Sequence, residues 1–137
     1  MNYLAAQQIF STDTFELHQF SFGQVRIFSQ VLAEITVNEG AEINTEMVEE
    51  LHTLLLSLFT NSFSLLINKT NTYSTKFDAL TQFGQLEEIN KIAVFAPSTM
   101  AKFSADFSAS IPTSRALNIQ VFSDQYDALA WLNSDEY

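Results

Sequence analysis

The fold is decided by the stretch Phe63-Ser64-Leu65-Leu66-Ile67-Asn68-Lys69-Thr70-Asn71-Thr72-Tyr73-Ser74-Thr75-Lys76-Phe77-Asp78-Ala79-Leu80. Its first five residues are mostly apolar and predict a buried strand. The polar segment 68–76 predicts a loop, and the residues from Phe77 onward predict a helix. In an open α/β sheet, ligands and partners bind at the carboxyl ends of the strands, so we expect any site to lie at this loop.

The chain before this stretch predicts three short strands and one helix. The strands begin at Phe15, at Val25 and at Val31, and their spacing favours an antiparallel meander. Asn38-Glu39-Gly40 is typical of a turn. The helix is predicted over 45–59, with Asn44 or Thr45 as its N-cap and apolar residues at helical spacing.

The chain after the stretch predicts alternating helices and strands. Ser74 and Thr75 are candidate caps of a helix that contains Phe77, Leu80, Phe83 and Leu86. The remaining elements are a strand over 92–96, a helix capped by Ser98 or Thr99, a loop over 110–118, a strand over 119–122 and a helix over 125–133 capped by Ser123 or Asp124.

The predicted order is therefore β-β-β-α-β-α-β-α-β-α. Such alternation is typical of an α/β domain with a mostly parallel sheet, here preceded by antiparallel strands and accompanied by about four helices. At 137 residues, one core is sufficient for the chain. We expect residues 1–12 to form an N-terminal arm and residues 13–137 to form a single domain.

The charge of the chain is strongly acidic, with 6 Lys and Arg against 16 Asp and Glu and a net charge of −10. This balance repels phosphate backbones, so nucleic acid is not an expected partner. The acidic residues concentrate in one region, in Glu34, Glu39, Glu42, Glu46, Glu49 and Glu50. They predict a solvated face, with contact to a basic protein surface as the alternative.

The absence of cysteine excludes disulfides, thiolate catalysis and cysteine-based metal sites. Residues 1–8 carry no basic residue and do not resemble a secretory signal. The most apolar window, 51–67, is too short and too polar to span a membrane. We therefore expect a cytoplasmic protein with no membrane span.

Four stretches carry a resemblance to a known family: the segment from Ala33 to Ile43, the strand Leu65-Leu66-Ile67-Asn68, the strand over 92–96, and the ending from Val121 to Leu132. In these stretches the chain resembles the STAS domains of bacterial anti-sigma-factor antagonists and sulfate-transporter tails. It is most similar to the small stand-alone SpoIIAA-like proteins of uncharacterised role. The resemblance covers about Phe15 to Leu132 and implies a STAS-like fold and a non-enzymatic regulatory or protein-interaction module.

In the anti-sigma-factor antagonists, a serine at the start of the helix after the central strand is phosphorylated. The resemblance implies the same role for the residues at that place in this chain. Ser74 and Thr75 occupy this place, and they are the candidate phosphoacceptors. The Asp-Ser-Ser/Thr-Gly setting of the family is missing, because Tyr73 precedes Ser74 and Lys76 follows Thr75. A plain N-cap role is the alternative.

Several catalytic chemistries are excluded by missing residues. Asn68 stands where a phosphoacceptor aspartate would be needed, and three glycines supply neither a nucleophile elbow nor a phosphate loop. His18 and His52 lie far apart in sequence, which is a weak metal signal, and His52 is typical of a half-buried helical histidine. We expect no catalytic activity, no cofactor and no metal.

Two functions remain open. The first is binding of a protein partner, or of a second copy of the chain, through Lys69, Tyr73, Ser74, Thr75 and Lys76, where two lysines flank an exposed aromatic residue. The second is carriage or sensing of a lipid or another small apolar ligand in a phenylalanine-lined pocket. The candidate lining residues are Phe77, Phe83, Phe95, Phe103 and Phe107, for which core packing is the alternative.

Overall fold

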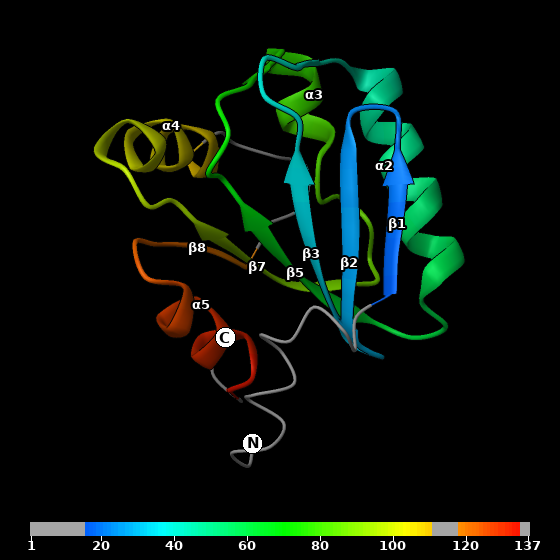
Figure 1. Cartoon of the computed structure of the whole chain (residues 1–137). Coiled ribbons are helices and arrows are strands. Elements are labelled where there is room, and N and C mark those ends of the chain that lie inside the picture. The colour runs from blue at the N-terminus through cyan, green and yellow to red at the C-terminus, as the bar shows by residue number, and fades with distance from the viewer. Residues whose placement is uncertain (1–15, 111–117, 135–137) are drawn as a thin grey trace.

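A six-stranded sheet runs through the computed structural model, which describes residues 16–110 and 118–134 (Figure 1). In spatial order its strands are β1 (Glu16–Phe20), β2 (Gly23–Ser29), β3 (Leu32–Val37), β5 (Phe63–Asn68), β7 (Ile89–Phe95) and β8 (Ile119–Phe122). The first three strands are antiparallel, and the strands from β3 to β8 pair in parallel. The predicted fold class, with antiparallel strands before a parallel sheet, is confirmed.

Strand β5 lies inside the sheet between β3 and β7. Its residue Ile67 pairs with Ile35 on one side and with Val94 on the other. Residues 63–67 are all buried. Both faces of this strand are covered, which explains why its sequence is nearly continuous in apolar residues rather than alternating.

In the part of the chain that the structure describes, four helices cover the two faces of the sheet: α2 (Thr45–Leu58), α3 (Phe77–Gln82), α4 (Thr99–Ala109) and α5 (Gln125–Leu132). Helices α2 and α3 lie behind the sheet in Figure 1, and α5 lies in front of it. None of the helices within the described ranges is long and apolar enough to cross a membrane.

Two separate apolar cores lie on the two sides of the sheet. The larger core joins the sheet to α2, α3 and α4, and its least exposed members include Val25, Leu55, Leu65, Ala79 and Ile92. The smaller core joins α5 to the other face, and its buried members are Leu32, Leu66, Ala93, Ala128, Leu129, Trp131 and Leu132. Neighbouring residues of one strand, such as Leu65 and Leu66, therefore belong to different cores.

Helix caps confirm three of the predicted starts. The Asn44 side-chain oxygen accepts a 2.9 Å hydrogen bond from the backbone N–H of Met47. The Ser98 hydroxyl accepts from the N–H of Ala101 at 3.0 Å, and the Asp124 carboxylate accepts from the N–H of Tyr126 at 2.7 Å. These side chains satisfy amide groups that have no partner within the helix.

The predicted capping role of Ser74 and Thr75 is wrong. These residues form β6 (Ser74–Thr75), which pairs in parallel with β4 (Glu42–Ile43) in a small second sheet. The backbone N–H of Ser74 donates to the Ala41 carbonyl at 3.0 Å. Because this pairing holds the segment extended, helix α3 begins later, with Lys76 as an N-cap that makes no side-chain capping bond.

Helix α3 is also shorter than predicted. It ends at Gln82, and its C-cap Phe83 has an extended backbone. Gly84 has a positive φ of 81°, a conformation that glycine adopts without steric cost. The chain therefore turns away at Gly84, and Leu86 lies beyond the helix instead of in it.

One member of the predicted acidic face is buried. Glu34 is only 4% exposed, whereas Glu39, Glu42, Glu46, Glu49 and Glu50 are exposed. Glu34 lies on the inner strand β3, where the sheet and its neighbours exclude water. The predicted arm over 1–12 and most of the predicted loop over 110–118 lie outside the described residues.

Candidate functional site

A cavity of about 600 Å³ lies between the sheet and helices α2, α3 and α4. Its described lining residues are mostly apolar: Phe22, Ile35, Val37, Ile43, Val48, Leu51, Ile67, Leu80, Phe83, Ile92, Val94, Ala105, Phe107, Ala109 and Ile119. The polar lining residues are Lys69, Tyr73, Ser74, Thr75, Ser104 and Ser108. The cavity is therefore a largely apolar space with a polar minority.

Strand alternation explains the apolar wall. Successive side chains of a strand point to opposite faces, so residues two apart share a face. Ile35 and Val37 of β3 both line the cavity, and so do Ile92 and Val94 of β7. The same alternation sends Ala93 to the α5 side.

Four of the five residues predicted to bind a partner or ligand line this cavity. They are Lys69, Tyr73, Ser74 and Thr75, and the polar segment after β5 brings them together. The fifth, Lys76, is not among the lining residues, and its Nζ lies 3.9 Å from Glu42 Oε1 with both side chains exposed. The loop that the sequence singled out thus forms a cavity wall.

Lys69 is the only charged side chain among the described lining residues, and it is 9% exposed. Its Nζ lies 3.8 Å from the centroid of the Tyr73 ring. A cation–π contact of this kind stabilises by about 0.5–2 kcal/mol, whereas removing an ion from water costs several kcal/mol. The Tyr73 ring therefore offsets only part of the desolvation cost, and burial lowers the pKa of Lys69.

Tyr73 is half-buried, so the prediction of an exposed aromatic residue at this position is wrong. The side chain packs against the larger core and also contacts Lys69. Burial raises the pKa of Tyr73 to about 12. At neutral pH the phenol is protonated, and its O–H is available as a hydrogen-bond donor beside the Lys69 ammonium.

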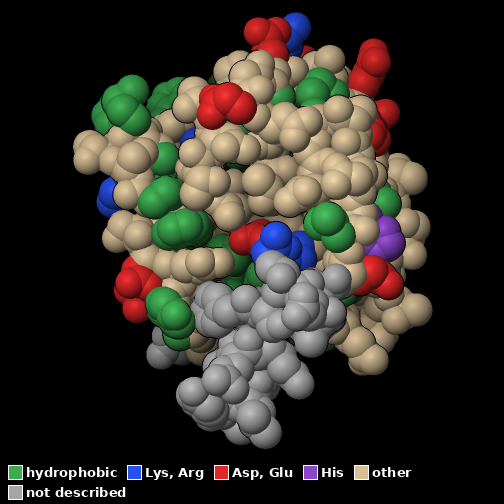
Figure 2. Space-filling view, in the orientation of Figure 1, with side chains coloured by type: hydrophobic (Ala, Val, Ile, Leu, Met, Phe, Trp, Pro, Cys, Tyr) green, Lys and Arg blue, Asp and Glu red, His purple; other side chains and the backbone are tan. Residues whose placement is uncertain are grey.

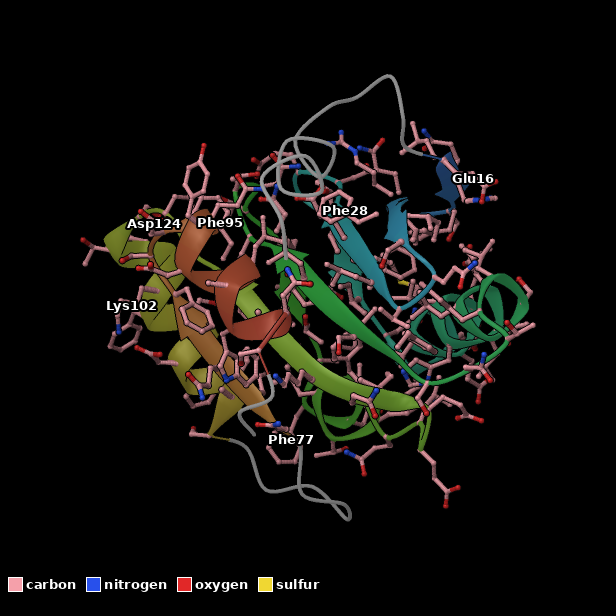
Figure 3. All side chains as sticks on the ribbon, turned by 90° about the horizontal axis from the view of Figure 1, so that it is seen from below. Glu16, Phe28, Phe77, Phe95, Lys102 and Asp124 are labelled. Atoms are coloured by element: carbon pink, nitrogen blue, oxygen red, sulfur yellow. The ribbon has the colours of Figure 1, made fainter. Side chains whose placement is uncertain are left out.

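The predicted set of five phenylalanines does not come together. Phe83 and Phe107 line the cavity, but Phe77 and Phe103 are 64% and 75% exposed. Phe95 packs with the α5 core, and Figure 3 shows it on the opposite side of the sheet from Phe77. The set was grouped by nearness in sequence, whereas the wall is assembled from strands that are distant in sequence.

Most of the lining was missed by the sequence prediction. Phe22 lies in the turn between β1 and β2, and Leu51 lies on α2, far from the loop in sequence. The signal that could have found such residues is the alternation within β3 and β7, because it marks one face of each strand. That signal identifies a face and does not say whether the face is filled or hollow.

The serine and the threonine of β6 differ in exposure to solvent. Ser74 is exposed and Thr75 is half-buried, and their short strand is held by β4. As a phosphoacceptor, Ser74 has the more accessible hydroxyl of the two. Modification of either residue stays a prediction.

The two histidines have different surroundings. His52 is 8% exposed, and its Nε2 accepts a 3.2 Å hydrogen bond from the backbone N–H of Gly84. Burial lowers the pKa of His52, so the imidazole is neutral at pH 7. His18 Nε2 lies 2.8 Å from Glu16 Oε2 on the exposed strand β1. Within residues 16–110 and 118–134, no group of three or more His, Cys, Asp and Glu residues could hold a metal ion.

Helix α4 carries apolar side chains on its outer surface. Met100, Phe103 and Phe107 are 79%, 75% and 59% exposed. Figure 2 shows apolar side chains at the surface over this helix. Ala105 is the buried residue of the helix. Phe107 also lines the cavity, whereas Met100 and Phe103 do not.

No model of a protein family matches the chain, and no curated protein matches it. The structure is similar to the crystal structure of an uncharacterized protein from the DUF3478 family with a SpoIIAA-like fold, from Shewanella loihica PV-4. The two chains are 16% identical, the match covers 86% of this chain and 91% of the other, and the TM-score is 0.49.

Proposed function

We propose that this chain is a non-enzymatic binding module that encloses a small, mostly apolar ligand between its sheet and helices α2, α3 and α4. The observation that carries the proposal is the cavity of about 600 Å³. Small-molecule sites are typically about 300–1,000 Å³, mostly apolar, and furnished with a few placed polar groups. The cavity has this size and this composition.

The side chains of the cavity favour binding over catalysis. General acid–base chemistry commonly uses histidine or carboxylate groups within hydrogen-bond reach of the reacting atoms. The described lining residues include neither. Lys69 and Tyr73 are the titratable groups there, and they contact each other.

Native mass spectrometry of the purified chain tests this function. A co-purifying small molecule is expected, and the Ala105→Trp variant should lose it because the indole fills the cavity from α4. Leu56→Trp is the matched control, since Leu56 is 43% exposed on α2 and does not line the cavity. Because a ligand can dissociate during purification, binding of the neutral dye N-phenyl-1-naphthylamine is also measured for the wild type and both variants. A chain that carries no ligand and binds no dye would contradict the proposal.

The second candidate function is regulation through a protein partner or a second copy of the chain. The exposed apolar side chains of α4 favour it, because apolar surface clusters often mark interaction sites. Of the five loop residues predicted for such contact, Ser74 and Lys76 are exposed. Sedimentation of the wild-type chain and of Phe103→Ser tests self-association, which should weaken in the variant.

A further inference from the structure

The cavity holds a positive charge that the described protein does not balance. Lys69 is nine-tenths buried, and its Nζ contacts the Tyr73 ring. No carboxylate belongs to the described lining residues. A buried ammonium group in such a setting is satisfied when an anion reaches it or when it loses its proton.

A second buried lysine shows how this protein satisfies an ammonium group by itself. Lys91 is 3% exposed, and its Nζ donates to the carbonyl oxygens of Trp131 and Ser134 at 2.9 and 2.7 Å. Lys69 has no carbonyl or carboxylate partner of this kind among residues 16–110 and 118–134. The two lysines are both buried, and they differ in their contacts: carbonyl oxygens accept from Lys91 Nζ, whereas Lys69 Nζ lies against an aromatic ring.

We propose that the ligand is an amphipathic carboxylate, whose anionic group pairs with Lys69 and whose apolar chain fills the rest of the cavity. This inference rests on the proposed function and names the class of ligand. A carboxylate accepts charge-assisted hydrogen bonds from an ammonium group and from a phenol such as Tyr73. One lysine balances one negative charge, which fits a carboxylate better than a dianionic phosphate ester.

The distribution of polar groups orients the ligand. Lys69, Tyr73, Ser74 and Thr75 lie together after the carboxyl end of β5, so the anionic group belongs at that end. Ile92 pairs with Leu65 nearer the middle of the sheet and belongs to the apolar part of the wall. The net charge of −10 disfavours small free anions, so burial of the apolar chain must supply most of the affinity.

The test compares two probes of equal chain length, decanoate and decan-1-ol, in displacing N-phenyl-1-naphthylamine from the delipidated chain. At about pH 8 the carboxylate is ionised, and we expect decanoate to bind the wild type at least about tenfold more tightly than the alcohol. Lys69→Met should abolish this preference while leaving the affinity for the alcohol within about threefold. Lys69→Arg keeps the cation and should retain the preference.

Lys76→Met is the matched control, because Lys76 is exposed and does not line the cavity. It should behave as the wild type, and thermal unfolding should show each variant folded. Equal affinity of the wild type for both probes, or a preference that survives Lys69→Met, would overturn the carboxylate assignment and leave the proposed function intact. If the folded wild type binds neither the dye nor either probe, the proposed function and this inference are both wrong.

Discussion

The Nζ of Lys91 donates a 2.9 Å hydrogen bond to the carbonyl oxygen of Trp131, and it lies 5.1 Å from the centroid of the indole ring of that residue. The same ammonium donates to the Ser134 carbonyl at 2.7 Å. Trp131 lies in the last turn of α5, where helix carbonyls lack partners within the helix and the dipole favours positive charge. These hydrogen bonds link the C-terminal end of α5 to strand β7.

Replacement of Lys91 by methionine should destabilise the protein. Lys91→Met removes charge-assisted hydrogen bonds to the buried Trp131 carbonyl and to the part-buried Ser134 carbonyl. We expect the free energy of unfolding to fall by about 1–3 kcal/mol. Urea unfolding followed by circular dichroism measures the change. Lys102→Met is the control, since Lys102 is exposed and pairs with Asp106 across one helical turn, and it should change stability by less than about 0.5 kcal/mol.

The corresponding substitution at Lys69 should act in the opposite direction. Lys69→Met removes a desolvated cation whose partner is the Tyr73 ring, so the ligand-free protein should become more stable at pH 7. Because burial lowers the pKa of Lys69, the unfolded state binds more protons between that lowered value and 10.5. The stability of the ligand-free wild type should therefore rise with pH in that window through this residue, and the variant should lack the rise. Denaturant titrations at several pH values measure both effects.

Glu34 should make stability fall with increasing pH. Burial raises the pKa of Glu34 above 4.5, although the Arg26 guanidinium at 3.7 Å and the Asn68 amide at 3.2 Å act in the other direction. Between 4.5 and the raised value, the folded state keeps a proton that the unfolded state releases. Stability contributed by this group is thus present below pH 4.5 and lost as the pH rises through the folded pKa.

The Glu34→Gln variant isolates that effect. Its stability should decline less than that of the wild type from pH 4.5 upward, as measured by urea unfolding at intervals across this range. Glu39→Gln is the control on an exposed glutamate, and it should follow the wild-type profile. Identical slopes for the wild type and Glu34→Gln would show that Glu34 titrates at its ordinary pKa.

Two of the helix starts predicted from sequence, at Asn44 and at Ser74, should respond differently to alanine. Asn44→Ala removes the oxygen that accepts from the Met47 N–H, and it should cost about 0.5–2 kcal/mol. Ser74→Ala should change stability by less than about 0.5 kcal/mol, because Ser74 is exposed and its backbone makes the pairing with Ala41. Thermal and urea unfolding of both variants compare the two positions. A large loss at Ser74 would indicate a side-chain role that the structure does not contain.

Phe63 should be among the positions most sensitive to truncation. Its ring is 1% exposed and stacks on Phe59 with the centroids 4.3 Å apart. Phe63→Ala should lower the free energy of unfolding by about 3–5 kcal/mol, through lost burial and the space left behind. Leu17→Ala on β1, where the side chain is 50% exposed, should stay within about 0.5 kcal/mol in the same urea titration.

Element type and order could be predicted because each long element has a clear period. The helical spacing of apolar residues from Val48 to Leu55 and the apolar run from Phe63 to Ile67 show which side chains are buried. The type of each element follows from that pattern. The pairing of Ser74 with Glu42 could not be predicted in this way. It joins two-residue strands that are far apart in the sequence, and neither strand is long enough to show a period.

Four of the residues at the loop where the sequence predicts a site line the cavity, and Tyr73 is half-buried there. Lys69 and Tyr73 follow a buried strand, and that position was sufficient to single them out. The cavity that they line is also lined by residues of α4 and by residues as distant in sequence as Phe22 and Ile119. The local sequence does not show which distant residues enclose a segment. The loop with Lys69 and Tyr73, expected at the surface, therefore lies in the wall of a cavity.

The division of the apolar residues between two cores has an evolutionary consequence. The α5 side is filled by Trp131, Leu129 and their neighbours, whereas the other side contains the cavity. Substitutions at distant sites without shared partners usually have additive effects. Lineages that inherit this architecture can therefore vary the cavity wall independently of the packing beneath α5.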